Sequence, residues 1–201
     1  MKNTTRVTIA SIFLLTLSAS VLAEKSLSYD YVEAGAIRFN IKPAHATYNY
    51  DGYILGGVKE VSDNVHVFAS YADTNNANIN LDFKTIGAGL HHSISSHTDI
   101  VFDLSRVNYS LNNSSLDLSA SGNFNTAELS ARHLLLDDLE FTAGFTKWGM
   151  KDNSISYSGF GVGAIKKISD ELSVKFDYKN LKISQGSEDV NPITLSLRHY
   201  Y

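Results

Sequence analysis

The chain has 201 residues and no cysteine, which excludes disulfides, thiol catalysis and thiolate metal sites. Its formal net charge is −4 at pH 7 and it has no basic block, so nothing indicates a nucleic-acid partner. Charged residues make up only 19 %, and 11 Tyr with 10 Phe make the chain rich in aromatic rings, which is unusual for a soluble domain.

The N-terminus has the three-part layout of a secretory signal peptide. Lys2 and Arg6 give it a positive start, an uncharged apolar run covers residues 7–17, and small residues lead to Ala23. The run is shorter than the roughly 20 residues that a membrane-spanning helix needs, so a retained anchor is the weaker interpretation. We therefore expect a cleaved signal peptide over residues 1–23, export through the periplasm, and one domain over residues 24–201.

Beyond residue 24 the recurring pattern is strict alternation of apolar and polar residues, which is typical of strands with one apolar face. In SVKFDYK, residues 173–179, three apolar side chains alternate with Lys175, Asp177 and Lys179. Tight connections are expected after the even-numbered strands and mostly longer polar ones after the odd-numbered strands, so the two ends of the sheet differ. In chain order, strands are expected near residues 27–39, 48–59, 65–72, 81–92, 98–109, 122–133, 139–148, 154–167, 172–181 and 192–201.

Alternation fits either a soluble sandwich, whose apolar faces meet in a core, or a transmembrane barrel, whose apolar faces meet lipid. In most expected strands an aromatic residue lies near the end that adjoins the longer connections, where a membrane interface would place it. The sequence therefore predicts an all-β, closed antiparallel transmembrane barrel of about ten strands, or about eight as the alternative, with short periplasmic turns and longer external loops. The expected membrane-interface aromatics are Phe39, Tyr48, Tyr71, Phe83, Tyr109, Phe124, Trp148, Tyr157, Tyr178 and Tyr201.

The last ten residues, PITLSLRHYY, have apolar residues at alternate positions and end on an aromatic ring. They resemble the C-terminal signature of bacterial outer-membrane barrels, from which His199 departs. The stretches LSYDYVEAG (27–35) and DGYILGGVKEVSDNVHVFASYA (51–72) are similar to the small outer-membrane β-barrel family of the OmpA/OmpX-like kind, whose first strand carries Tyr-x-Tyr-Val-Glu. The resemblance implies that an assembly signal is formed by Ile193, Leu195, Leu197 and Tyr201.

The same resemblance implies a location in the outer membrane, with outer-membrane lipid and the barrel-assembly machinery as partners. The resemblance implies no defined molecular activity. We expect a monomer without a cofactor, and the sequence names no external ligand.

Alternation assigns charged residues of both signs to the lumen. The interior of a barrel of about ten strands is only slightly wider than the side-chain-filled eight-stranded case. We therefore expect the charges to pair in a plug, with a narrow polar pore as the alternative. The predicted lumenal charge network is Glu33, Asp51, Lys59, Asp103, Glu128, Arg132, Glu140, Lys175, Asp177, Lys179 and Arg198.

Two further features of the predicted lumen are its inward glycines and the orientation of Glu33, which the pattern leaves open. Inward glycines at residues 87, 89, 159, 161 and 163 are expected to make room for large inward groups such as Tyr53 or Phe68. Glu33 would face lipid if the tyrosines of the first strand did. Either a bulge near residue 35 reverses the phase, or the tyrosines point inward and Glu33 pairs with Arg132 or Arg198; Glu33 inside is favoured.

His91, His92 and His97 cluster around a turn, but adjacent histidines on a strand point to opposite faces, so solvated positions are expected rather than a metal site. No spacing of serine, histidine and carboxylate forms a catalytic triad. The sequence thus predicts a non-enzymatic outer-membrane protein with a structural or surface-interaction role and a filled lumen. A narrow porin-like channel for small solutes or ions is the alternative, and a lipid-modifying outer-membrane enzyme is a weaker one.

Overall fold

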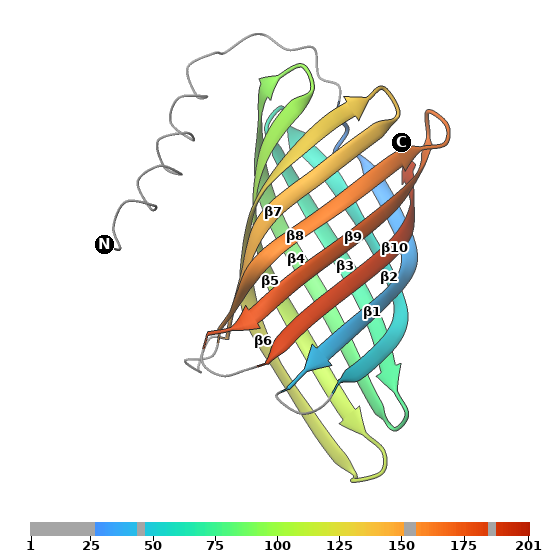
Figure 1. Cartoon of the computed structure of the whole chain (residues 1–201), viewed down its shortest axis with the longest axis vertical. Coiled ribbons are helices and arrows are strands. Elements are labelled where there is room, and N and C mark those ends of the chain that lie inside the picture. Colours follow the sequence, from blue (N-terminus) through green and yellow to red (C-terminus); the bar gives the residue numbers. More distant parts are fainter. Residues whose placement is uncertain (1–26, 44–46, 151–155, 185–187) are drawn as a thin grey trace, which may run out of the picture.

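The computed structural model describes residues 27–43, 47–150, 156–184 and 188–201, so the predicted signal peptide lies outside the described residues. The described residues form ten antiparallel strands in one closed barrel (Figure 1). In chain order the strands are β1 Tyr31–Lys42, β2 Tyr48–Ser62, β3 Val65–Asn76, β4 Ile79–Ser95, β5 Thr98–Asn113, β6 Leu118–Leu136, β7 Leu139–Met150, β8 Ser156–Lys167, β9 Leu172–Ile183 and β10 Asp189–Tyr200.

The barrel closes where the first strand meets the last. Tyr31 of β1 lies opposite Tyr200 of β10, and the pairing continues to Lys42 opposite Asp189. All other pairs are between strands adjacent in sequence. The predicted all-β, closed antiparallel barrel of about ten strands is therefore confirmed. Among the described residues, no helix is long and apolar enough to cross a membrane.

The two ends of the barrel differ, but less than predicted. Short turns follow the even-numbered strands at the end where the C-terminus lies (Figure 1). At the opposite end the expected loops over residues 73–80 and 110–121 are mostly strand, because polar residues there continue the ladder as far as turns at 77–78 and 114–117. Ala77 and Asp117 take positive φ of 47° and 49°, which lets the chain reverse tightly. The other expected long connections fall partly outside the described residues.

The outer face of the wall is apolar. In β10, Leu195 and Leu197 are 54 % and 53 % exposed, while Ser196 and Arg198 between and beside them are buried inside. Outward side chains of the other strands include Leu55, Ile86, Leu104 and Phe160. An apolar outer surface on a closed barrel is what contact with lipid requires.

The predicted girdle of aromatic residues on the lipid face is largely wrong. The rings of Phe39 on β1 and Phe83 on β4 have centroids 5.0 Å apart, although these strands are not neighbours in the wall, so the two rings meet across the lumen. Phe124 is 5 % exposed and lies 5.5 Å from Trp148. The aromatics that point inward are Phe39, Phe83, Tyr109, Phe124, Trp148 and Tyr157.

The remaining predicted interface aromatics do not line the interior in this way. Tyr71 lies on the outward phase of β3 beside exposed Tyr53, and Tyr178 alternates with the inward charged residues of β9. Tyr48 and Tyr201 are about half exposed or more, at the ends of the wall. Alternation could not give the orientation of the six inward rings, because at the outer end the apolar phase faces the lumen and polar residues such as Arg38 and Lys84 face outward.

Candidate functional site

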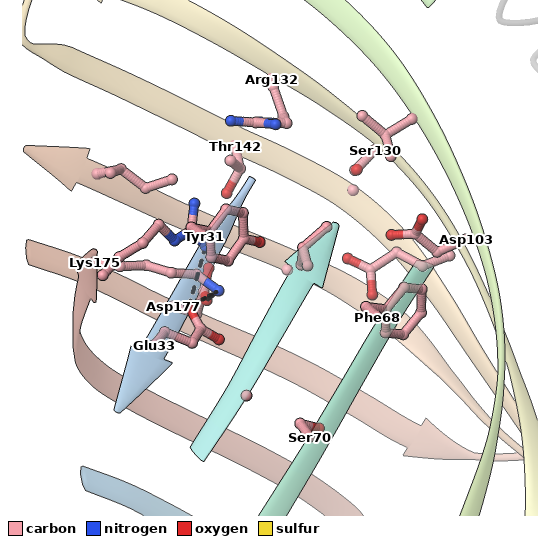
Figure 2. A pocket seen from close by; sticks show the side chains of 18 of the residues that line it. Tyr31, Glu33, Phe68, Ser70, Asp103, Ser130, Arg132, Thr142, Lys175 and Asp177 are labelled. Carbon is pink, nitrogen blue, oxygen red and sulfur yellow. Dashed lines mark hydrogen bonds and ion pairs between the residues drawn. The ribbon is translucent and has the colours of Figure 1, made fainter. Parts of the chain in front are cut away.

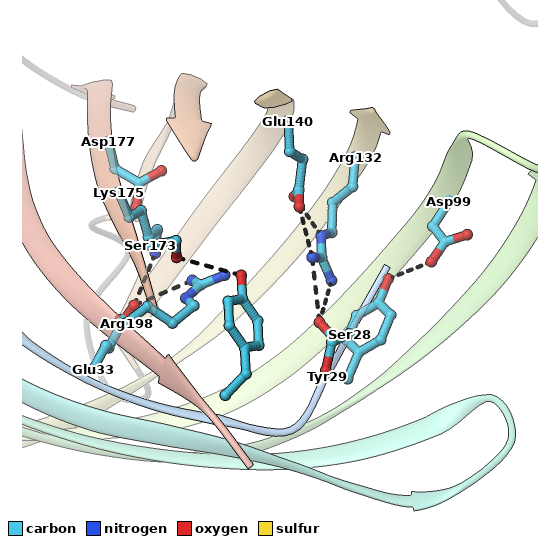
Figure 3. A network of polar contacts seen from close by, with 11 residues as sticks. Ser28, Tyr29, Glu33, Asp99, Arg132, Glu140, Ser173, Lys175, Asp177 and Arg198 are labelled. Atoms are coloured by element: carbon cyan, nitrogen blue, oxygen red, sulfur yellow. Dashed lines mark hydrogen bonds and ion pairs between the residues drawn. The ribbon is translucent and has the colours of Figure 1, made fainter. Parts of the chain in front are cut away.

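A charge network fills the half of the lumen nearest the C-terminus (Figure 3). Glu33 of β1 lies directly opposite Arg198 of β10 and accepts a hydrogen bond of 3.1 Å from its Nη2. Lys175 of β9 lies 3.6 Å from the same carboxylate and 2.6 Å from Asp177. Glu33 is therefore inside and pairs with Arg198, one of its two predicted partners, and its charge is shared between two buried cations.

A second buried pair joins β6 to β7. Arg132 donates from Nε and Nη2 to the two carboxylate oxygens of Glu140, at 2.7 and 3.0 Å. This fork geometry is the strongest arrangement available to an arginine and a carboxylate, and both side chains are at most 10 % exposed. Arg132 also donates to the backbone carbonyl of Ser28 at 3.3 Å, which ties the segment before β1 to the far wall (Figure 3).

The segment before β1 turns into the lumen. Tyr29 is 3 % exposed, donates its hydroxyl to Asp99 at 2.9 Å, and stacks on His91 with ring centroids 3.8 Å apart. Tyr29 lies before the first strand, outside the spanning wall. Its burial raises the pKa of the phenol and keeps it a neutral donor. Leu27 packs in a buried cluster with Val101. The segment thus closes this end of the barrel.

The histidines correct one expectation. His91, expected to be solvated at a turn, is 3 % exposed inside the barrel, while its neighbour His92 is exposed on the other face. His66 is also buried and its Nε2 lies 2.8 Å from Asp103. The phase of β4 carried the missing signal, because residue 91 follows the inward glycines at 87 and 89 at steps of two.

Two members of the predicted lumenal set lie outside. Asp51 pairs with Arg38 on the outer face, with a bond of 3.0 Å from Nη2, and Lys59 binds Asp30 at 3.0 Å. Tyr53, expected to point inward, is 47 % exposed. The reason is the phase of β2, in which the residues at 50, 52, 54, 56 and 58 face inward. The members that the structure places inside are Glu33, Asp103, Glu128, Arg132, Glu140, Lys175, Asp177, Lys179 and Arg198.

The glycine prediction is confirmed for Phe68. A Cβ at Gly87 would lie 2.3 Å from the Phe68 ring and 2.6 Å from the carbonyl oxygen of Leu104. Only a residue without a side chain leaves room for this ring. Phe68 therefore reaches into the middle of the lumen, beside Asp103 (Figure 2).

Within the part of the barrel that the structure describes, two cavities of about 260 Å³ each lie in the lumen. The one nearer the C-terminus is lined by the charge network and by Tyr31, Ser130 and Thr142 (Figure 2). The other is lined mainly by aromatic and aliphatic side chains, including Phe124 and Trp148. Beyond this second cavity, buried Tyr50, Leu81, Leu181 and Val190 belong to an apolar cluster near the outer rim. Charge and apolarity are thus separated along the barrel axis.

Pairing governs the chemistry of the polar half. Its carboxylates and cations lie in contact with one another and form a structural network. Among the described residues, no three histidine or acidic side chains gather in a way that could hold a metal ion.

Comparison with known proteins identifies the fold to which this barrel is similar. No protein family and no curated protein matches the chain. An outer membrane channel from Pseudomonas putida F1 is similar in structure, with 10 % identity, a TM-score of 0.53, and 92 % of this chain and 100 % of that chain covered. At this identity it shows the fold alone, and this chain therefore has the fold of an outer-membrane β-barrel.

Weaker likenesses are to other outer-membrane proteins. Ail, the attachment invasion locus protein of Yersinia pestis, is 12 % identical with a TM-score of 0.45, covering 87 % of this chain and 100 % of that chain. Neisserial surface protein A is 10 % identical with a TM-score of 0.45, covering 87 % and 98 %. At these scores neither bears on the role of this chain.

Proposed function

We propose that this protein is an integral outer-membrane barrel with a closed lumen, acting as a structural or surface-interaction protein and not as an enzyme. The observation that carries the proposal is closure at two levels. Tyr29 and the Arg132–Glu140 pair fill the lumen near the C-terminal end, and the apolar cluster around Leu181, which is 0 % exposed, fills it near the outer rim. A hydrated ion would have to displace both.

Support for the surface role comes from the outer end. The β3–β4 and β5–β6 hairpins continue beyond the neighbouring strands, and the β5–β6 hairpin projects farthest (Figure 1). The β3–β4 tip is polar and exposed, and the β5–β6 tip exposes Ser115 and Ser119 together with Leu116 and Leu118. Outer-membrane lipid around the wall and the barrel-assembly machinery reading β10 are the partners that we propose, with the protein acting as a monomer.

Electrical recording tests the closed lumen. Purified protein in planar lipid bilayers should give no conductance steps across a range of voltages, because neither layer offers a continuous wet path. A porin of known conductance, reconstituted in the same way, serves as the positive control. Steps whose size follows salt concentration would overturn the proposal.

The second candidate is a narrow channel for small solutes or ions. It is favoured by the two cavities, which follow one another along the axis and share Asp103, Glu128 and Lys179 in their linings. Opening would then require only that the segment before β1 and the outer apolar cluster move aside. The same recordings decide between the two candidates.

A further inference from the structure

The outer cavity of the lumen has apolar walls. It has a volume of about 260 Å³. Its sides come from strands on opposite walls of the barrel and are formed by Ile37, Phe39, Phe83, Val107, Phe124 and Trp148. An apolar cavity of about 150 Å³ accepts benzene. This cavity therefore has room for one aromatic ring with a short chain.

The floor of the same cavity is polar and rich in acceptors. Asp103 and Glu128 supply carboxylates, of which Asp103 bonds to His66 at 2.8 Å and Glu128 pairs with Lys179. A carboxylate has about four acceptor positions, so each retains capacity beyond these partners. Ser105 and Thr126, 2.6 Å apart, add hydroxyl groups to the floor.

The two parts of the cavity specify opposite ends of one ligand. The walls favour a ring, which stacks or packs edge to face on aromatic side chains. The floor favours a donor head, above all an ammonium group, because a cation and a carboxylate form the stronger, charge-assisted bond. An anionic head would instead approach two carboxylates, and among the described residues that line the cavity Lys179 alone is a cation that could receive it.

We propose that the outer cavity binds a small aromatic amine, with its ring among Phe83, Phe124 and Trp148 and its ammonium group at Asp103 and Glu128. Such a site goes beyond the closed-lumen role and does not depend on it, since a cavity of this shape would bind the same ligand in a barrel that conducts. The Tyr50 and Leu181 side chains, buried nearer the outer rim, separate the site from the outside and would have to yield for entry.

The single tryptophan of the chain makes the site directly measurable. Trp148 lines the cavity and is the only tryptophan. Protein in lipid nanodiscs is titrated with 2-phenylethylamine, 2-phenylethanol and phenylacetate, which share a ring and differ in the head group, while Trp148 fluorescence is followed. The amine should give a saturable change about fivefold tighter than the alcohol, the difference between a charge-assisted and a neutral hydrogen bond, and phenylacetate should bind most weakly.

Variants separate the cavity from the surrounding lipid. Glu128→Gln should bring the amine to the affinity of the alcohol, whereas Asp73→Asn, a matched change on the outer phase of β3, should leave it unchanged. Ser70→Phe places a ring in the lumen and should abolish the saturable change (Figure 2).

Equal affinities for the three probes, a purely linear rise, or full binding by Ser70→Phe would overturn the site. If Glu128→Gln fails to fold, the wild-type series decides. A protein that both conducts and binds the amine would refute the closed lumen and leave the amine site in place.

Discussion

Glu33 is held by cations from two other strands, Arg198 at 3.1 Å and Lys175 at 3.6 Å, and all three side chains are largely buried. At the residue scale, the charge network should be most sensitive to the loss of a charge at Glu33. Removing one partner of a buried ion pair leaves an uncompensated charge, which costs more than the pair itself contributes.

Glu33→Gln should therefore lower the free energy of unfolding by roughly 3 kcal/mol, the lower end of the range for breaking a buried pair, because Lys175 keeps Asp177. Urea unfolding of barrels in detergent micelles measures it. Asp51→Asn makes the same chemical change in the exposed pair with Arg38 and should cost less than about 1 kcal/mol. Equal costs for the two variants would show that Glu33 is in contact with water.

Gly87 provides a second test, of packing without charge. Gly87→Ala should destabilise the barrel by about 1–3 kcal/mol, because its Cβ would collide with the Phe68 ring and with a backbone carbonyl. Gly149→Ala is the matched control, since no described residue outside its chain neighbours lies within 4 Å of a Cβ there. Thermal or urea unfolding of both variants compares them, and an unchanged Gly87→Ala barrel would mean that Phe68 does not occupy the lumen.

The inward position of Glu33 could be predicted from the cost of an acidic group in lipid. The choice between Arg132 and Arg198 could not, because it depends on the register between β1 and β10, strands from opposite ends of the chain. Asp51 and Lys59 were misplaced for a related reason. Near the end of a strand an outward charge can lie in water, so charge alone does not indicate the lumen.

At the scale of elements, the segment before β1 acts as a plug although it is not a strand. Its well-buried contacts include those of Tyr29 with Asp99 and His91 and that of the Ser28 carbonyl with Arg132. The single ring of Tyr29 should therefore make a large contribution to the stability of the barrel.

Tyr29→Ala should lower the free energy of unfolding by ~3–5 kcal/mol, as for other buried rings cut to alanine, and should leave Asp99 without its phenol donor. Tyr48→Ala removes a ring that is 49 % exposed at the start of β2 and should have a much smaller effect. Denaturant unfolding in micelles compares the two. Similar small losses would mean that the segment before β1 does not pack in the lumen.

The strands themselves were predictable because alternation persists over six to eight residues, as at 172–179 in β9 and 193–198 in β10. The direction of the aromatic rings was not. At the outer end of β4, for example, Leu81 and Phe83 face inward while Asp82 and Lys84 face outward, so period two gives the alternation but not which of the two phases faces the lumen. The polar hairpins likewise looked like loops, because their ladder bonds come from backbone and not from side-chain type.

At the scale of the whole molecule, stability depends on closure. Each strand has a partner on both sides, so no edge is left for a detergent or another chain to pair with. The prediction of a barrel was correct although the aromatic girdle that favoured it was largely misplaced. What supported it soundly was the C-terminal alternation, whose Leu195 and Leu197 face outward while Arg198 completes the network inside.

A closed barrel of this kind should resist unfolding by dodecyl sulfate until it is heated. Unboiled protein should therefore migrate differently from boiled protein on a detergent gel, and should be found with membranes. Leu195→Pro removes a ladder donor in the strand that closes the wall and should abolish the unboiled band, whereas Leu195→Ala at the same position should keep it. Identical mobility of boiled and unboiled wild-type protein, with the chain in the soluble fraction, would contradict a membrane barrel, because only the closed and lipid-embedded wall accounts for heat-dependent migration.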